Sequence, residues 1–296
     1  MSAAVRRFLT VRRVNLLLLA AFAVLAAINS GYYYRLVYFR STDTVRFEGG
    51  VYELDPDDRK ITGTILMNGS WEPTETALIR SKLKPGDTFI DVGANFGYYT
   101  VLASKIVGPT GRVIAFEPDP RSFTYLQRNV ARNGCTNVVL EQKALADKPG
   151  TLTLHVSDSN RGAHSLIAAG TPDVSHTVDV PAVRLDDYLA DKDGRVDLVK
   201  IDTEGAEGFI LAGMQDTLRN NPAAKLVTEY IPSKLTDSGY PPDKFFGLLQ
   251  PHGFRYSEID EFRGTVLPVA EQDVMAHNLQ TIRERSLTNL YLSRDR

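Results

Sequence analysis

Two acidic residues and two glycines stand where a ligand-binding loop requires them, in FIDVGANFGYYT (89–100) and the later FEP (116–118). Asp91 ends an apolar run, Gly93 and Gly97 follow it, and Glu117 ends the next apolar run. Glycines let a backbone bend tightly and approach a ligand closely, and the helix that begins behind them offers free N–H groups. The pattern predicts a ligand-binding loop at the carboxyl end of a strand.

The residue types within this loop distinguish two ligands. A dinucleotide uses G-x-G-x-x-G, so that its pyrophosphate sits on a helix N-terminus. Here Asn95 replaces the middle glycine, and the carboxylate of Asp91 would repel a pyrophosphate. S-adenosylmethionine carries no phosphate, its ammonium group would be attracted to Asp91, and Glu117 is placed to accept hydrogen bonds from ribose hydroxyls. The spacing therefore favours S-adenosylmethionine; taken singly, these residues also fit a helix cap and simple turns.

A second acidic stretch, KIDTEGAE (200–207), leaves a later apolar run. If a methyl group is transferred to a hydroxyl, the acceptor must lose a proton, so a general base is useful. We predict Asp202 first and Glu204 second as catalytic residues, whereas Glu207 fits a helix N-terminus. His164 is a further candidate base, although a lone loop histidine is usually only exposed. No metal site is predicted.

The order of apolar runs predicts the elements that hold these residues. Strands alternate with amphipathic helices from residue 87 onward, which indicates a mainly parallel sheet covered on both faces. Segments 44–55 and 60–69 have strand character, and 204–221 has the period of one helix. Glu229 ends another strand, at the same predicted sheet edge as Asp202, and is a candidate for binding the acceptor.

Composition limits the functional classes. The chain has 296 residues, a formal net charge of -2 and a single cysteine, Cys135. The near-neutral charge argues against a nucleic-acid partner, and one cysteine excludes an intrachain disulfide and a thiolate metal cluster. Oligomeric state cannot be predicted.

The first forty residues differ from the rest. Arginines precede VNLLLLAAFAVLAAI (14–28), and a tyrosine cluster follows it. About 20 apolar residues span a bilayer core, so we predict an uncleaved membrane anchor; a cleaved signal peptide is the alternative. The arginine bias places the following domain outside the cytoplasm, whereas a cytosolic cofactor favours a cytosolic domain. A monotopic anchor is one resolution of this conflict, and we expect a cytosolic catalytic domain.

Several stretches together resemble the FkbM-type S-adenosylmethionine-dependent methyltransferases. They are GSWEPTETALIRSKLKPGDTFIDVGANFGYYT, GRVIAFEPDPRSFTYLQRNVARNG, KALAD, VPAVRLDDYL and VDLVKIDTEGAEGFILAGM. The resemblance implies an α/β class I methyltransferase fold, Rossmann-like, with a seven-stranded mostly parallel sheet whose last strand is antiparallel. It also implies O-methyl transfer, and a cofactor pocket formed by Asp91, Gly93, Ala94, Asn95, Gly97, Glu117, Ala144, Leu145 and Glu72.

These observations give one organisation and three competing functions. We predict an N-terminal anchor (1–40), a region leading into the fold (41–86) and a cofactor-binding domain (87–296). The favoured function is methylation of a hydroxyl on a small-molecule, glycan or lipid-linked acceptor, with acceptor-binding loops near 157–176 and 257–287. The alternatives are a nicotinamide-dependent oxidoreductase and a membrane-tethered binding protein without catalysis.

Overall fold

A computed structural model describes residues 44–58, 60–157, 162, 164–167, 174–274 and 288–294. The predicted anchor, the greater part of the predicted acceptor loop 157–176 and residues 275–287 of the other predicted loop therefore lie outside the described residues. Within these ranges, no helix is both long and apolar enough to cross a membrane.

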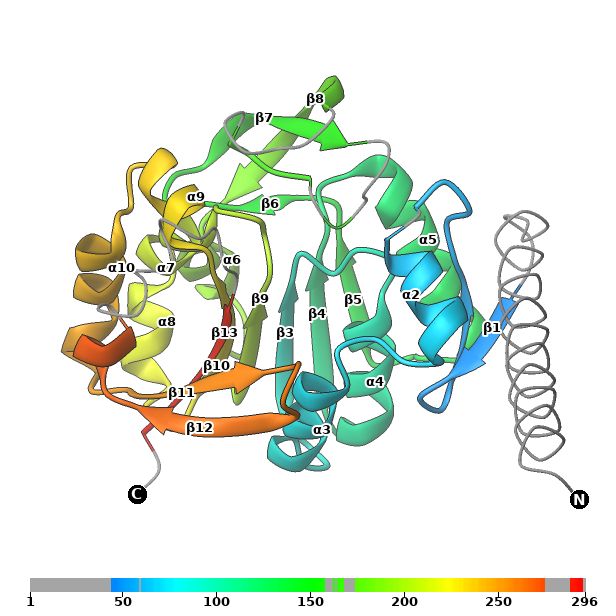
Figure 1. Ribbon diagram of the computed structural model, residues 1–296, viewed down its shortest axis with the longest axis horizontal. Helices are drawn as coiled ribbons and strands as arrows, with labels where there is room; N and C mark the ends of the chain where they lie inside the picture. The colour runs from blue at the N-terminus through cyan, green and yellow to red at the C-terminus, as the bar shows by residue number, and fades with distance from the viewer. Residues whose placement is uncertain are drawn as a thin grey trace, which may run out of the picture.

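One sheet of eight strands forms the centre of the molecule, in the order β12-β11-β13-β10-β9-β3-β4-β5 (Figure 1). Its strands are β3 (Thr88–Val92), β4 (Arg112–Phe116), β5 (Val138–Glu141), β9 (Leu198–Ile201), β10 (Lys225–Tyr230), β11 (Arg255–Asp260), β12 (Thr265–Val269) and β13 (Thr288–Ser293). The pairs β5–β4, β4–β3, β3–β9 and β9–β10 are parallel, whereas β13 is antiparallel to both β10 and β11.

The predicted class I, Rossmann-like sheet is confirmed with one addition. Seven strands follow the expected arrangement, with the last strand of the chain, β13, inserted antiparallel beside β10. The eighth strand, β12, pairs antiparallel with β11 and extends the edge. The seven-stranded prediction missed it because its side chains are mostly half-buried or exposed, as an edge strand permits.

Helices cover both faces of this sheet (Figure 1). Side chains alternate along β3, so that Phe89 packs in one apolar cluster and Ile90 in the other. The first cluster contains α2 (Ile61–Asn68), α3 (Pro73–Lys82), α4 (Tyr98–Val107) and α5 (Pro120–Arg132), with the hairpin of β1 (Thr44–Phe47) and β2 (Gly50–Glu53). The second contains α6 (Leu185–Leu189), α7 (Glu207–Ala212), α8 (Gln215–Asn220), α9 (Pro232–Asp237) and α10 (Pro242–Leu249), which the short 3-10 turn η2 (Gln250–His252) follows.

A small sheet stands beyond the carboxyl ends of the central strands (Figure 1). It contains β6 (Ala144–Leu145), β8 (Val174–Val183) and β7 (Gly150–Ser157) in that order. The segment 138–145 divides between the two sheets, because Ala144 and Leu145 pair with β8 instead of β4.

Two local predictions are wrong. Residues 60–69 form a helix, α2, because the Asp58 carboxylate accepts the N–H groups of Lys60 and Ile61, and Gly69 ends the helix at φ 69°. The helix predicted over 204–221 breaks into α7 and α8 at Gly213. A side chain there would lie 2.1 Å from the carbonyl oxygen of Ala146, so this close contact requires glycine.

Candidate active site

A pocket lies where β3, β4 and β9 end, under the small sheet. Its wall contains the last residues of β3 and β4, Val92 and Phe116, and Leu154 from β7. It brings together the following predicted site residues: Gly93, Asn95, Glu117, Ala144, Leu145, His164, Asp202 and Glu204. Five other predicted residues, Asp91, Ala94, Gly97, Glu72 and Glu229, lie outside its lining.

The loop between β3 and α4 forms the pocket floor in a conformation that its sequence permits. Gly93 has φ 81°, and a Cβ there would lie 1.9 Å from the carbonyl oxygen of Asp202. Gly97 has φ 89° and packs against Leu126, where a Cβ would meet Cδ1 at 2.6 Å. Asn95 between them is also left-handed, at φ 50°. The two glycines therefore let the loop pass close to β9 and α5, and leave room for a ligand above it.

Glu117 ties this loop to the end of β4. Its Oε2 accepts the N–H of Asn95 at 2.7 Å, and its Oε1 accepts the N–H of Asp119 at 2.9 Å. Burial, with the nearby Asp119 carboxylate, raises the pKa of Glu117 to about 8. Each oxygen keeps a lone pair for a further donor, so Glu117 both shapes the loop and can accept hydrogen bonds from a pair of hydroxyls.

Asp91 lies behind the pocket floor instead of on the pocket surface. Its Oδ2 accepts a hydrogen bond from Thr100 Oγ1 at 2.5 Å, and the side chain is 1% exposed. It is paired in register with Lys200 on β9, so both side chains lie on the same face of the sheet. Burial raises the pKa of Asp91 to about 6, although Lys200 opposes this shift. The contact between Asp91 and the cofactor ammonium stays a prediction, and the burial of Asp91 behind the pocket floor does not favour it.

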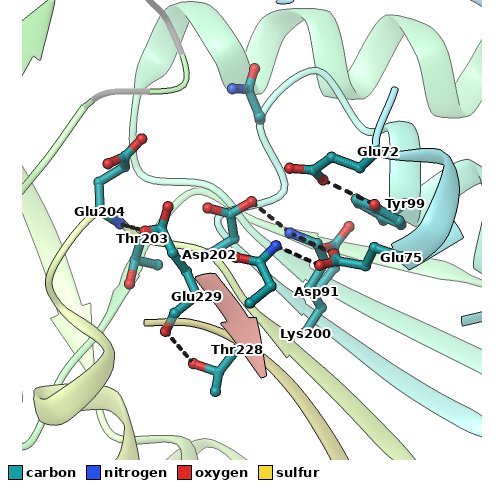
Figure 2. A network of polar contacts seen from close by, with 12 residues as sticks. Glu72, Glu75, Asp91, Tyr99, Lys200, Asp202, Thr203, Glu204, Thr228 and Glu229 are labelled. Atoms are coloured by element: carbon teal, nitrogen blue, oxygen red, sulfur yellow. Dashed lines mark hydrogen bonds and ion pairs between the residues drawn. The ribbon is translucent and has the colours of Figure 1, made fainter. Parts of the chain in front are cut away.

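Lys200 is the centre of an ionic cluster that lies on one side of Asp202 (Figure 2). Its Nζ lies 2.6 Å from Asp202 Oδ2 and 3.6 Å from Glu75 Oε1, and 4.6 Å from the ring centre of Tyr99. Tyr99 in turn donates its hydroxyl to Glu72 Oε2 at 3.0 Å. We call Lys200, Asp202, Glu75, Tyr99 and Glu72, with Asp91, the Lys200 cluster.

Glu72 joins this cluster from the start of α3. It has φ 42°, and burial, with Glu75 nearby, raises its pKa to about 8. Among the described residues, Glu48, Glu72, Asn95 and Glu204 have positive φ without being glycine. Three of these strained positions thus lie at the pocket or in the Lys200 cluster, as strain at functional sites predicts.

A second acidic group lies on the other side of Asp202, around Glu204 (Figure 2). The Glu204 carboxylate pairs with Lys234 of α9, and its backbone N–H donates to Glu229 Oε2 at 3.1 Å. Its carbonyl oxygen accepts the hydroxyl of Ser165 at 2.7 Å. Burial raises the pKa of Glu204 in spite of Lys234. Glu204 is therefore held by contacts with Lys234 of α9, Glu229 of β10 and Ser165.

The two remaining candidates have narrower roles. Glu207 Oε1 accepts the N–H groups of Thr203 and Gly205 at the start of α7, as expected for a helix N-terminus.

His164 Nδ1 accepts the N–H of Ser157 at 3.1 Å, and its Nε2 lies 3.8 Å from Asp119 Oδ2. Because Nδ1 accepts a hydrogen bond, a proton on this ring belongs on Nε2, so His164 offers a donor there, which disfavours it as a base.

Several residues of the site were not found from the sequence. Glu75 and Lys234 belong to no recognisable sequence motif. Asn289, in the last strand β13, donates a hydrogen bond of 2.6 Å to Glu75. These contacts cross large sequence separations and have no local signal. Lys143, which lines the pocket beside Ala144, stands next to a segment that the family resemblance had already indicated.

Comparison with known proteins now identifies the family. The sequence model of the methyltransferase FkbM domain matches residues 91–256, more than half of the chain. The chain belongs to the FkbM methyltransferase family. This membership confirms the predicted class, an S-adenosylmethionine-dependent methyltransferase, and S-adenosyl-L-methionine as its cofactor.

Individual relatives of this FkbM family member are distant. Methyltransferase 1 of Beauveria bassiana is 33% identical over 151 residues, which cover 45% of this chain and 60% of that protein. The 31-O-demethyl-FK506 methyltransferase FkbM of Streptomyces tacrolimicus is 29% identical over 163 residues, 46% of this chain and 62% of that protein. The 2-O-methyltransferase NoeI of Sinorhizobium fredii is 24% identical over 203 residues, which cover 62% of this chain and 82% of that protein. The chain thus spans about three fifths of the first two relatives.

Among solved structures, the methyltransferase FkbM from Methylobacillus flagellatus KT is similar with a TM-score of 0.44 and 15% sequence identity. The similarity covers 71% of this chain and 44% of that one.

Proposed function

We propose that this protein transfers the methyl group of S-adenosyl-L-methionine to a hydroxyl oxygen of a glycan, lipid-linked or natural-product acceptor. The observation that carries the proposal is one pocket in which Glu117 and the Gly93 loop face two acidic groups, Asp202 and Glu204. The names of two relatives, a 31-O-demethyl-FK506 methyltransferase and a 2-O-methyltransferase, support oxygen as the atom methylated.

Strand order supports one direction for the cofactor along the sheet edge. Ala144 and Leu145 lie beyond β5, Glu117 follows β4, the Gly93 loop follows β3, and Asp202 follows β9. The apolar 144–145 segment suits an adenine ring, and Glu117 suits the two ribose hydroxyls. The methionine end then points toward Asp202 and the Lys200 cluster. The side toward β10, with Glu204 and Glu229, remains for the acceptor.

When bound, S-adenosyl-L-methionine would supply an electrophilic methyl group on a sulfonium, and the carbon–sulfur bond would break as the acceptor oxygen bonds to the methyl carbon, leaving a thioether. The protein aligns the two partners, which is worth about 7–11 kcal/mol of barrier in favourable cases. It must also receive the hydroxyl proton. We propose Glu204 for this role, because burial raises its pKa above the ordinary value, which makes it a stronger proton acceptor, and it lies on the acceptor side. The sequence favours Asp202, but the proposed cofactor orientation places Asp202 at the methionine end. A lysine pairs with each acid, Lys200 with Asp202 and Lys234 with Glu204, so the ion pairs do not separate the two candidates.

Calorimetric titration with S-adenosylhomocysteine and with NAD tests the cofactor. We expect binding of the first and none of the second; the reverse result would favour the oxidoreductase. Transfer of a labelled methyl group to a panel of hydroxylated acceptors then tests catalysis. If S-adenosylhomocysteine binds but no acceptor is methylated, and Glu204→Gln binds as wild type does, the binding-protein alternative gains support.

The predicted anchor at 14–34 suggests an acceptor at a membrane, and this part of the proposal rests on sequence alone. Detergent-solubilised lipid-linked glycans and matched soluble analogues test it. A faster methylation of the lipid-linked form is expected, and equal rates would remove the reason for proposing a membrane acceptor.

A further inference from the structure

Lys200 is a fully buried lysine that methyl transfer itself does not require. It lies in β9 between β3 and β10, with Asp91 and Val227 as its register partners. Its side chain is 3% exposed. Burying an ammonium group costs several kcal/mol unless it is paired. An apolar side chain would fill this position without that cost, so the presence of a lysine requires another explanation.

The Lys200 cluster contains more acids than bases. Burial lowers the pKa of Lys200, but Asp202, Glu75, Glu72 and Asp91 together raise it well above the ordinary value. Lys200 is therefore an ammonium ion, and it faces four carboxyl groups. Asn289 and Tyr99, both neutral donors, each donate one hydrogen bond, to Glu75 Oε2 and to Glu72 Oε2 respectively. A second cation that enters the pocket would meet the Asp202 carboxylate, which lines it.

Asp202 is the member of the cluster that reaches the pocket. Its side chain is 31% exposed and lines the cavity, whereas Glu75 is 0% exposed. One oxygen, Oδ2, is bound to Lys200, so the carboxylate cannot rotate freely. Asp202 also follows β9, at the end of the sheet edge to which the methionine end of the cofactor points in the proposed function.

We infer that Lys200 is a positioning residue, which holds Asp202 to receive the ammonium group at the methionine end of the cofactor. This inference rests on the proposed function. Fixing the carboxylate before binding removes the cost of ordering it when the ligand arrives. A charge-assisted hydrogen bond between the carboxylate and the ammonium then contributes to affinity.

Two ligands separate this role from a merely structural one. S-adenosylhomocysteine carries the amino acid end, whereas 5′-methylthioadenosine has the same nucleoside and thioether without it. We expect Lys200→Met to weaken S-adenosylhomocysteine binding about tenfold, roughly 1.4 kcal/mol, and to change 5′-methylthioadenosine binding less than about twofold. Glu117→Gln, at the ribose end, should weaken both ligands alike. Isothermal calorimetry measures each affinity.

A double-mutant cycle tests whether Lys200 acts through Asp202. Asp202→Asn should weaken S-adenosylhomocysteine at least as much as Lys200→Met does, and the double variant should be no weaker than Asp202→Asn alone. Lys244→Met is the matched control, because Lys244 also stacks on a tyrosine, Tyr240, but lies away from the pocket. It should bind both ligands as wild type does.

Other outcomes overturn the inference. Equal losses for both ligands in Lys200→Met, additive losses in the cycle, or tighter binding of S-adenosylhomocysteine would each do so; the last would mean that Lys200 competes with the ligand ammonium. If Lys200→Met fails to fold, Glu75→Gln/Lys200→Met removes one acid together with the base and carries the same expectations. A wild-type protein that binds neither ligand would refute the proposed function instead.

Discussion

At the scale of single residues, Gly93 decides whether the pocket floor can form. It has φ 81° and lies so close to Asp202 that a Cβ would be 1.9 Å from the carbonyl oxygen. We expect Gly93→Ala to reduce the free energy of unfolding by about 2–4 kcal/mol, from backbone strain and a displaced loop. S-adenosylhomocysteine affinity should fall about tenfold or more as the loop moves. Chemical denaturation and calorimetry measure the two effects.

Gly49 is the matched control for this prediction. It has nearly the same backbone angle, φ 79°, but a Cβ there would meet nothing within 4 Å. Gly49→Ala therefore carries the strain without the clash and should cost only about 1–2 kcal/mol, with unchanged ligand affinity. If both variants lose the same stability and both keep their affinity, the close approach at Gly93 does not matter.

At the scale of elements, α3 depends on a cap that a distant turn supplies. The Glu261 carboxylate, between β11 and β12, accepts the N–H of Thr74 at 3.0 Å and that of Glu75 at 2.7 Å. These are among the first free donors of the helix. We expect Glu261→Ala to reduce the free energy of unfolding by about 1–2 kcal/mol and to speed amide hydrogen exchange in α3. Denaturant titration and hydrogen-exchange mass spectrometry measure these changes.

The neighbouring residue offers a control in the same turn. Phe262 is 99% exposed, so Phe262→Ala removes no buried contact. It should leave the free energy of unfolding and the hydrogen exchange of α3 unchanged. Since α3 carries Glu72 and Glu75 into the Lys200 cluster, Glu261→Ala should also weaken S-adenosylhomocysteine slightly. Unchanged exchange in α3 would show that the cap does not hold the helix.

At the scale of the whole molecule, the buried carboxyl groups link stability to pH. Burial raises the pKa of Glu72 and Glu117 to about 8, of Glu207 to about 7 and of Asp91 to about 6. Each group keeps a proton in the folded state that the unfolded chain has released, so folding takes up protons between about pH 4.5 and 8. Stability from these groups is complete below that window and is lost as pH rises through it.

We therefore expect the ligand-free protein to melt at a higher temperature at pH 5.5 than at pH 8. Each group adds up to about 1.4 kcal/mol per pH unit within its own range. Differential scanning calorimetry measures the melting temperature, and Glu72→Gln and Glu117→Gln should each flatten its pH dependence. A melting temperature that rises between pH 5.5 and 8 would contradict the assignment of these groups as protonated.

The sequence by itself determined the fold class, the family and the residues of the pocket floor. Gly93, Asn95 and Glu117 could be found because their signals are local: glycines beside a strand end, and an acid at the next strand end. Parallel strands bring their carboxyl ends to one edge, so local patterns predict neighbours in space. The sequence also predicted Asp202, Glu204 and Glu229 at that edge of the sheet.

Only the tertiary structure decided which acids face the ligand and which lie behind it. Asp91 and Asp202 look equivalent in the sequence, yet Asp91 is buried beside Thr100 and Asp202 lines the pocket. Asp91 lies within β3, in register with Lys200, whereas Asp202 follows the end of β9 at the edge of the sheet. The same holds for the break at Gly213, where a contact with the carbonyl oxygen of Ala146 overrode the local pattern. The cap that Asp58 provides to α2 is local, in contrast, and could have been found from the sequence. Burial and charge pairing depend on residues far apart in the chain, and local sequence carries no record of them.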